Sequence, residues 1–200
     1  HTFSILLNNR DEFLDRKSQP AAVHHFGKAC HEEGDNVISG LDVEGGGTWL
    51  GINRHGRIAM LTNITEEARR RNTSRGNLVS DFLLSSTKQT MDQYVEELTK
   101  TAVTEEERAT HQDYAGFNLM LISVASEDNA SEPAKPGGTV RRPRMALVTN
   151  YGGGGVLSAR WLDEQESALH GISNGVDHKT MHLWTKVKEG QDSLEASIKP

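Results

Sequence analysis

Runs of apolar side chains predict the strands of this chain. Residues 3–7 place apolar side chains at every second position, which is typical of a short half-buried strand. A second short strand is predicted over residues 37–42. The stretch 117–124 is apolar almost throughout, as expected for a central strand covered on both faces, and 145–151 resumes the same sheet. Two shorter runs predict further strands at 156–161 and 169–175.

A β-hairpin is predicted over residues 48–63, with Gly56 supplying the positive φ angle that such a turn needs. With a four-residue loop, Ile52 faces Arg57, and Asn63 lies at the strand end beside three successive glycines. An amide in that place can donate to a developing oxyanion, and bare backbone lets a substrate approach closely. Asn63 can equally close the strand by bonding its own backbone.

The predicted helices come in contiguous blocks. Apolar side chains at helical spacing predict a helix that begins near Ser74, and capping boxes at 90–93 and 104–107 predict the starts of two more. Residues 181–198 predict a last helix. Because strands and helices do not alternate one by one, the pattern favours a layered α+β fold.

The chain length predicts one domain over residues 1–200, since chains of this size bury a substantial core. The polar segment 14–36 is interpreted as an irregular loop. Residues 126–144 hold three of the five prolines and many charges, so they predict a surface loop with the composition of a disordered segment.

Composition argues against several classes of protein. The net charge is -6, and Lys and Arg are mostly scattered, so no nucleic-acid surface is expected. No apolar run approaches the roughly 20 residues that span a bilayer. The single cysteine, Cys30, excludes an internal disulfide and favours a reducing, cytoplasmic setting.

Histidines gather in two places without the spacing of a metal site. His24, His25 and His31 lie near Cys30, but these residues lack any standard zinc pattern. A second pair at 178 and 182 is one helical turn apart and lacks an evident third ligand. The sequence therefore predicts no metal site.

A charged turn follows the first predicted strand. Arg10, Asp11 and Glu12 place a guanidinium and two carboxylates together. The turn can be a salt-bridged stop to the strand, or a paired Arg and carboxylate that hold a substrate group in fixed geometry. Asn174 ends the strand predicted at 169–175 in the same manner as Asn63 ends its own.

Six short blocks in the chain resemble the successive signatures of the NRDE-motif family, also called the transport and Golgi organisation protein 2 family. They occur in order over roughly residues 3–190. The blocks are 9–13, 46–51, 61–63, 74–76, 116–119 and 172–174.

The resemblance implies an αββα sandwich of the N-terminal nucleophile hydrolase type, similar to cholylglycine hydrolase and penicillin V acylase. In that branch a cysteine directly after the initiator methionine attacks an amide, and its own α-amine is the base. Family members typically begin Met-Cys-Ile, so the chain from His1 to Pro200 would be incomplete at both ends of this fold. Cys30 is no substitute, because an internal residue has no free α-amine.

The same resemblance assigns roles to individual side chains. Arg10 with Asp11 or Glu12 would hold the nucleophile and the substrate, Asn63 would be the oxyanion donor, and Asn174 the second amide. The candidate catalytic residues are therefore Arg10, Asp11, Glu12, Asn63 and Asn174, and the candidate substrate-binding residues are Gly46, Gly47 and Trp49.

The leading hypothesis is a cleft that acts on small amide or thioester acyl substrates without a cofactor. By resemblance, the family is linked to the secretory pathway, Golgi organisation and lipid homeostasis, with a cytoplasmic, Golgi-associated or mitochondria-associated location. One alternative is a non-catalytic carrier of haem or lipid, with His24, His25, His31 or Cys30 as axial ligands. Another is a Golgi-associated scaffold.

Overall fold

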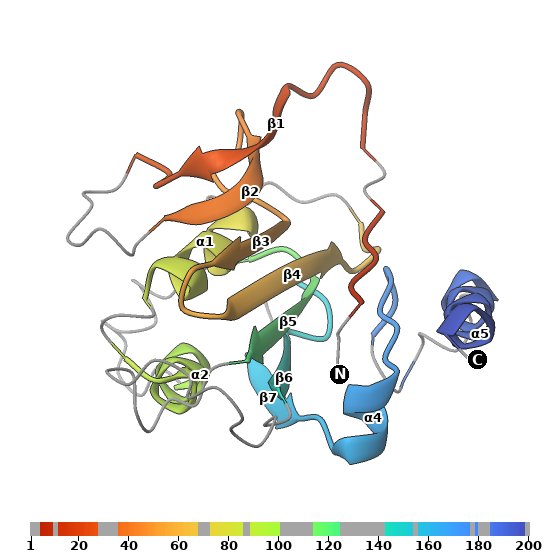
Figure 1. Cartoon of the computed structure of the whole chain (residues 1–200). Helices are drawn as coiled ribbons and strands as arrows, with labels where there is room; N and C mark the ends of the chain where they lie inside the picture. The colour runs from red at the N-terminus through yellow and green to blue at the C-terminus, as the bar shows by residue number, and fades with distance from the viewer. Residues whose placement is uncertain are drawn as a thin grey trace.

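The described part of the chain is built around a seven-stranded antiparallel sheet, in which each strand pairs with its neighbours in sequence (Figure 1). The computed structural model describes residues 5–9, 12–27, 36–67, 73–85, 89–100, 114–124, 143–153, 156–176, 179 and 185–198. The strands are β1 (Ser18–His24), β2 (Val37–Asp42), β3 (Leu50–Asn53), β4 (Arg57–Asn63), β5 (Phe117–Ser123), β6 (Arg144–Thr149) and β7 (Ser158–Trp161). The helices are α1 (Gly76–Leu84), α2 (Met91–Thr99), α4 (Glu164–Ala168) and α5 (Thr185–Ile198).

Helices α1 and α2 cover one face of the sheet and enclose the main core with it (Figure 1). Leu78, Val79, Phe82 and Leu83 of α1 are buried, as their helical spacing predicts. The capping box that begins α2 is confirmed, since both of its side-chain bonds are present. All seven residues of β5 are buried, which confirms the prediction of a central strand. Mixed helices and an antiparallel sheet confirm the α+β class.

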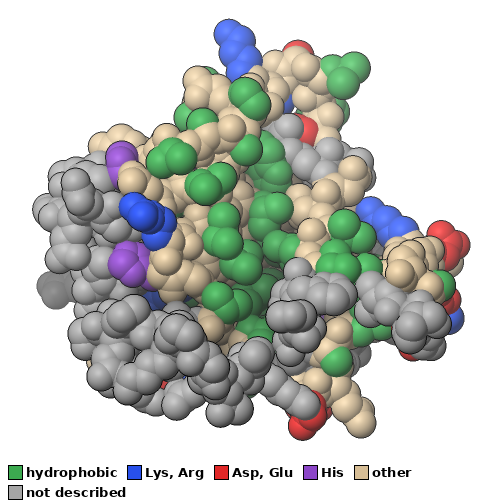
Figure 2. Space-filling view, viewed as in Figure 1, with side chains coloured by type: hydrophobic (Ala, Val, Ile, Leu, Met, Phe, Trp, Pro, Cys, Tyr) green, Lys and Arg blue, Asp and Glu red, His purple; other side chains and the backbone are tan. Residues whose placement is uncertain are grey.

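The opposite face of the sheet carries an apolar row that crosses six strands. The strand register places these side chains in one line: Val23, Ile38, Ile52, Ile58, Ile122 and Met145. The first three are 60%, 51% and 41% exposed. Figure 2 shows hydrophobic side chains gathered over the sheet on this side, which we call the open face. An exposed apolar surface of this extent is typical of a face that another layer of protein covers.

Three predictions about the course of the chain are wrong. Residues 5–9 form no strand in the structure, whereas β1 lies inside the segment 14–36, for which the sequence predicts an irregular loop. β1 is an edge strand whose side chains are mostly exposed, and it contains Pro20. An edge strand needs neither apolar alternation nor a complete set of N–H donors, so its sequence resembles that of a loop. Residues 169–175 also lack strand structure.

The hairpin of β3 and β4 is confirmed, but its register differs by one residue from the prediction. Ile52 pairs with Ile58 rather than with Arg57. The cause is Asn53, whose side-chain oxygen accepts hydrogen bonds from the backbone N–H groups of His55 and Arg57, both at 3.0 Å. Gly56 has φ +75, as the turn requires. The predicted helix start at 104–107 and residues 126–142 of the predicted loop lie outside the described residues.

Candidate functional site

A cleft of about 1040 Å³ opens where β4 ends and the chain enters α1. Most of its wall comes from five parts of the chain: residues 5–9, the connection from β2 to β3, the end of β4 with residues 73–76, the segment 169–174, and one side of α5. In Figure 1 the N-terminal segment, the segment before residue 175 and α5 lie at the same end of the sheet. Segments far apart in sequence therefore build one site.

Two asparagines predicted as site residues meet at this cleft. Asn174 Nδ2 donates a hydrogen bond to the backbone oxygen of Asn63, with a distance of 2.8 Å. Both residues line the cleft. Asn174 Oδ1 accepts a bond from Lys186 of α5 at 3.2 Å, so its amide orientation is fixed from two sides. The two asparagines that end predicted strands in the sequence thus lie next to each other in the structure.

A buried asparagine that was not among the predicted site residues holds the segment around Asn174 in place. Asn118 of β5 is 0% exposed, and its Nδ2 donates to the backbone oxygens of Ser173 at 3.2 Å and Gly175 at 2.8 Å. Thr62 of β4 also donates to the Ser173 oxygen, at 2.7 Å. These bonds clamp the backbone on both sides of Asn174 to the sheet.

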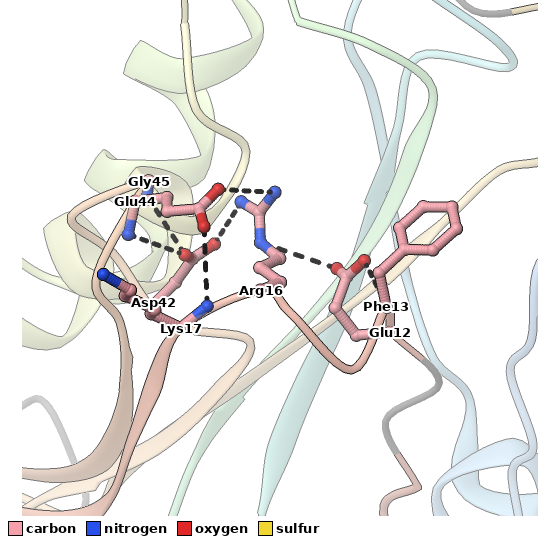
Figure 3. Close-up of polar contacts among 7 residues, drawn as sticks. All are labelled: Glu12, Phe13, Arg16, Lys17, Asp42, Glu44 and Gly45. Carbon is pink, nitrogen blue, oxygen red and sulfur yellow. Dashed lines mark hydrogen bonds and ion pairs between the residues drawn. The ribbon is translucent and has the colours of Figure 1, made fainter.

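Arg16 gathers three carboxylates at the rim of the cleft (Figure 3). Its Nη2 lies 2.6 Å from Asp42 Oδ2, its Nε 3.6 Å from Glu12 and its Nη1 3.8 Å from Glu44. Asp42 also accepts bonds from the backbone N–H groups of Glu44 and Gly45. The cluster ties the segment after Glu12 to the end of β2.

The Asp42 carboxyl has a pKa below its ordinary value. Burial acts to raise this pKa, but the hydrogen bond from Arg16 and the bonds from Gly45 and Glu44 lower it further than burial raises it. A carboxyl whose pKa is depressed by folding contributes stability above its unfolded pKa, and this contribution is lost as the pH falls through the folded pKa.

Replacing Asp42 by asparagine is therefore expected to lower the Tm at pH 6 and to leave it nearly unchanged near pH 2. The reason is that acid already removes the Asp42 charge from the wild type. Melting both proteins from pH 2 to 7 tests this. The control is Asp192→Asn, which alters an exposed pair on α5 and should preserve the wild-type profile. A constant Tm difference at every pH would contradict the prediction.

Arg75 brings a second guanidinium into the cleft from the residue that precedes α1. Its Nη1 donates to the backbone oxygen of Gly116 at 2.8 Å. Burial lowers the pKa of Arg75, while the charges of Glu66 and Glu12 oppose that effect. Among the described residues, no carboxylate lies within ion-pair distance of Arg75.

The three successive glycines include one residue that packs against α1. A Cβ atom on Gly47 would lie 2.4 Å from the carbonyl carbon of Gly76, and Thr48 N donates to the Gly76 oxygen at 3.3 Å. Gly45 lines the cleft, whereas Gly46 and Gly47 are not part of its wall. Close packing therefore explains Gly47, and the predicted substrate contacts of Gly46 and Gly47 stay predictions.

The other predicted site residues fall into two groups. Glu12 and Trp49 line the cleft, whereas Arg10 and Asp11 lie outside the described residues. Sequence reasoning missed Arg16, Asp42, Arg75 and Asn118. The sequence signal for Arg16 was its position four residues after Glu12, which suits an ion pair. Arg75 and Asn118 lie in two of the six blocks of the family resemblance, 74–76 and 116–119. Asp42 depends on a contact between distant segments.

The structure describes two of the candidate haem ligands, His24 and His25. His24 Nε2 lies 2.8 Å from Ser39 Oγ, so iron at that nitrogen would have to displace the Ser39 contact. Cys30 and His31 lie outside the described residues.

Within the described ranges, no group of three or more His, Cys, Asp or Glu side chains could hold a metal ion. The helices of those ranges are also too short or too polar to cross a bilayer.

Comparison with known proteins gives one consistent relationship. A sequence model of the family described as Transport and Golgi organisation 2 matches residues 3–200. The Transport and Golgi organization protein 2 homolog of Bos taurus is 36% identical over 127 residues, which are 62% of this chain and 40% of that protein. The Mus musculus homolog is 41% identical over 87 residues, 40% of this chain and 28% of that protein. The chain thus spans well under two thirds of these relatives.

Proposed function

Because this chain belongs to the Transport and Golgi organisation 2 family, we propose that its cleft is the acyl site of an N-terminal nucleophile hydrolase that cleaves small amide or thioester substrates. The proposal includes a role in Golgi organisation and lipid homeostasis in the cytoplasm near the Golgi. The observation that carries it is the meeting of Asn63 and Asn174 in one cleft.

The two asparagines suit the chemistry of acyl transfer. Asn63 sits at the exposed end of β4, where its amide can donate to a substrate oxygen. Asn174 uses one N–H on the Asn63 backbone, which leaves its second N–H for a ligand. Amide donors fixed before the reaction stabilise an oxyanion without reorganisation, because their dipoles already point at the developing charge.

The nucleophile in this proposal is a cysteine at the mature N-terminus of the full-length protein. Its sulfur forms a bond to the substrate carbonyl carbon, and its α-amine takes the thiol proton and passes it to the leaving nitrogen or sulfur. Water then cleaves the acyl-enzyme and releases the carboxylic acid. Asn63 would donate to the oxyanion in both steps, and Asn174 would orient the α-amine.

The proposed fold has a second sheet on the open face, supplied by parts of the full-length protein other than residues 1–200. The apolar row across six strands supports this, since an αββα sandwich buries such side chains between its two sheets. Cross-linking from a photoreactive residue at position 38 in the full-length protein would identify what covers the row.

Iodoacetamide labelling of the full-length protein at near-neutral pH tests the hydrolase. Intact mass should show removal of the methionine, and the terminal cysteine should be alkylated at least about tenfold faster than Cys30, because only an activated thiol is a thiolate at that pH. Cys30→Ser is the control and should leave the fast phase intact. A terminal cysteine as slow as Cys30, or none, would overturn the proposal.

Replacing Asn63 or Asn174 by alanine gives the second test. Turnover of an acyl substrate found by screening should fall in both variants, and by about 100-fold in Asn63→Ala, the usual cost of removing one oxyanion donor. The labelling rate should stay the same in Asn63→Ala and should fall in Asn174→Ala, because Asn174 would orient the α-amine. Ligand binding that persists without the terminal cysteine would favour the carrier. A haem carrier would also show a Soret band that shifts when His24 or His25 is replaced.

A further inference from the structure

The two arginines of the cleft differ in how many negative charges lie next to them. Arg16 is surrounded by three carboxylates. Arg75 is different, because the one bond described for it goes to a neutral peptide oxygen. A guanidinium has five N–H donors in a planar fork, so most of its donors are left for the cleft.

The nearest negative charges are held by other partners. The two carboxylate oxygens of Glu66 accept bonds from the backbone N–H groups of Gly116 and Gly153. Glu12 accepts a bond from Phe13 N and faces Arg16. Glu66 and Glu12 act on Arg75 only through space, so its fork remains able to receive an incoming anion.

The position of Arg75 brings this fork close to the asparagine pair. The Gly116 oxygen that Arg75 bonds also accepts a bond from the backbone N–H of Ile64, at 2.9 Å. Ile64 directly follows Asn63. The guanidinium is thus bound to the same carbonyl group as the residue that follows Asn63, at the end of β4.

A partly buried guanidinium in this position has two energetic costs. Burial disfavours its charge, and a positive side chain at the start of α1 has the wrong sign for the helix dipole, with no acidic residue in the first turn. Trp49, Met60 and Leu194 give the same cleft an apolar wall. Such a cleft suits a ligand that is apolar along most of its length and anionic at one point.

We infer that Arg75 is a specificity residue that binds a carboxylate of the substrate a few bonds from the scissile carbonyl. The inference rests on the proposed function, because it takes the Asn63 and Asn174 end of the cleft as the reacting end. A planar carboxylate matches the two-pronged guanidinium, and bidentate pairing fixes both position and orientation. The substrate class is therefore the carboxylate-bearing amide or thioester, such as the monoamide of a short dicarboxylic acid.

Calorimetric titration of the full-length protein with two matched compounds tests this. The compounds are N-octylsuccinamic acid and N-octylsuccinamide, which share shape and chain length and differ in the carboxylate. The wild type should bind the acid about tenfold more tightly, the usual effect of one charge-assisted bond. Arg75→Gln should bind both alike, and Arg75→Lys should keep part of the preference because it keeps the charge.

The matched control is Arg144→Gln, which removes an arginine that pairs with Asp92 at the surface and stacks on Trp161. It should retain the full preference for the acid. The melting temperature of each variant shows whether it is folded, and the preference of the wild type does not depend on any variant. Equal binding of the two compounds by the wild type, a preference that survives in Arg75→Gln, or failure of both compounds to bind would each overturn the inference.

The result also separates this inference from the proposed function. A carboxylate preference that requires Arg75, together with a slow terminal cysteine, would keep the binding role and reject the hydrolase. Fast alkylation and amide turnover without any preference would keep the hydrolase and reject the role of Arg75.

Discussion

Replacing Gly47 by alanine is expected to destabilise the protein by about 3 kcal/mol, the upper end of the usual cost of overpacking. The new Cβ would lie 2.4 Å from the carbonyl carbon and 2.6 Å from the carbonyl oxygen of Gly76. Both atoms belong to backbone at the start of α1, so no side-chain rotation can relieve the contact. The start of α1 would have to move away from the β2–β3 connection, and Arg75 would move with it.

Denaturant unfolding of the wild type and two alanine variants measures this effect. The control is Gly46→Ala, where a Cβ meets nothing within 4 Å but the backbone has φ +73. That variant should lose only about 1 kcal/mol, the cost of a left-handed conformation for a residue with a Cβ. Equal losses in both variants would show that backbone conformation, rather than packing against α1, explains the glycines.

Replacing Asn118 by aspartate is expected to cost on the order of 4 kcal/mol at pH 7, although the two side chains have almost the same shape. The Asn118 amide donates to the backbone oxygens of Ser173 and Gly175 from a position that is 0% exposed. A carboxylate there would be buried without a cation to pair with and would face two carbonyl oxygens. The clamp on the Asn174 segment would open.

The loss of stability in Asn118→Asp should be larger at high pH than at low pH. Burial of the new carboxyl raises its pKa in the folded protein above the unfolded value of about 3.9. The deficit should therefore be small below pH 4 and grow as the pH rises toward the folded pKa. Unfolding experiments at pH 3 and pH 7 measure it, with Asn77→Asp as the control, because a carboxylate in the first turn of α1 is tolerated by the helix dipole. A deficit that is the same at both pH values would exclude charge burial as the cause.

The sequence predicts those parts of the fold that depend on neighbouring residues. The prediction of β2 has the same bounds as the observed strand, because its apolar side chains recur locally. The register of the hairpin was missed because one side chain, Asn53, closes the turn in a manner that loop length alone does not reveal. β1 was missed because its pairing with β2, rather than its own composition, makes it a strand.

The site was predictable only in part, from two asparagines that end predicted strands. Asn63 and Asn174 stood out in the sequence, but their hydrogen bond joins residues on β4 and on a segment after α4. Arg16 with Asp42, and Asn118 with Ser173, are likewise contacts between distant segments. A single sequence contains no pattern that pairs such residues, because tertiary packing brings them together.

The order of the strands in the sheet has a consequence for how the chain acquires structure during its synthesis. Every strand pairs with the strands before and after it in sequence, so residues 18–161 complete the whole ladder of backbone hydrogen bonds by themselves. The ladder can therefore form in the order in which the ribosome releases the strands. The apolar row on the open face is only partly buried once the ladder is complete, since Ile122 is 8% exposed whereas Val23, Ile38 and Ile52 are 60%, 51% and 41% exposed. Backbone pairing of β1, β2 and β3 can thus be complete while their side chains on the open face are still exposed to solvent.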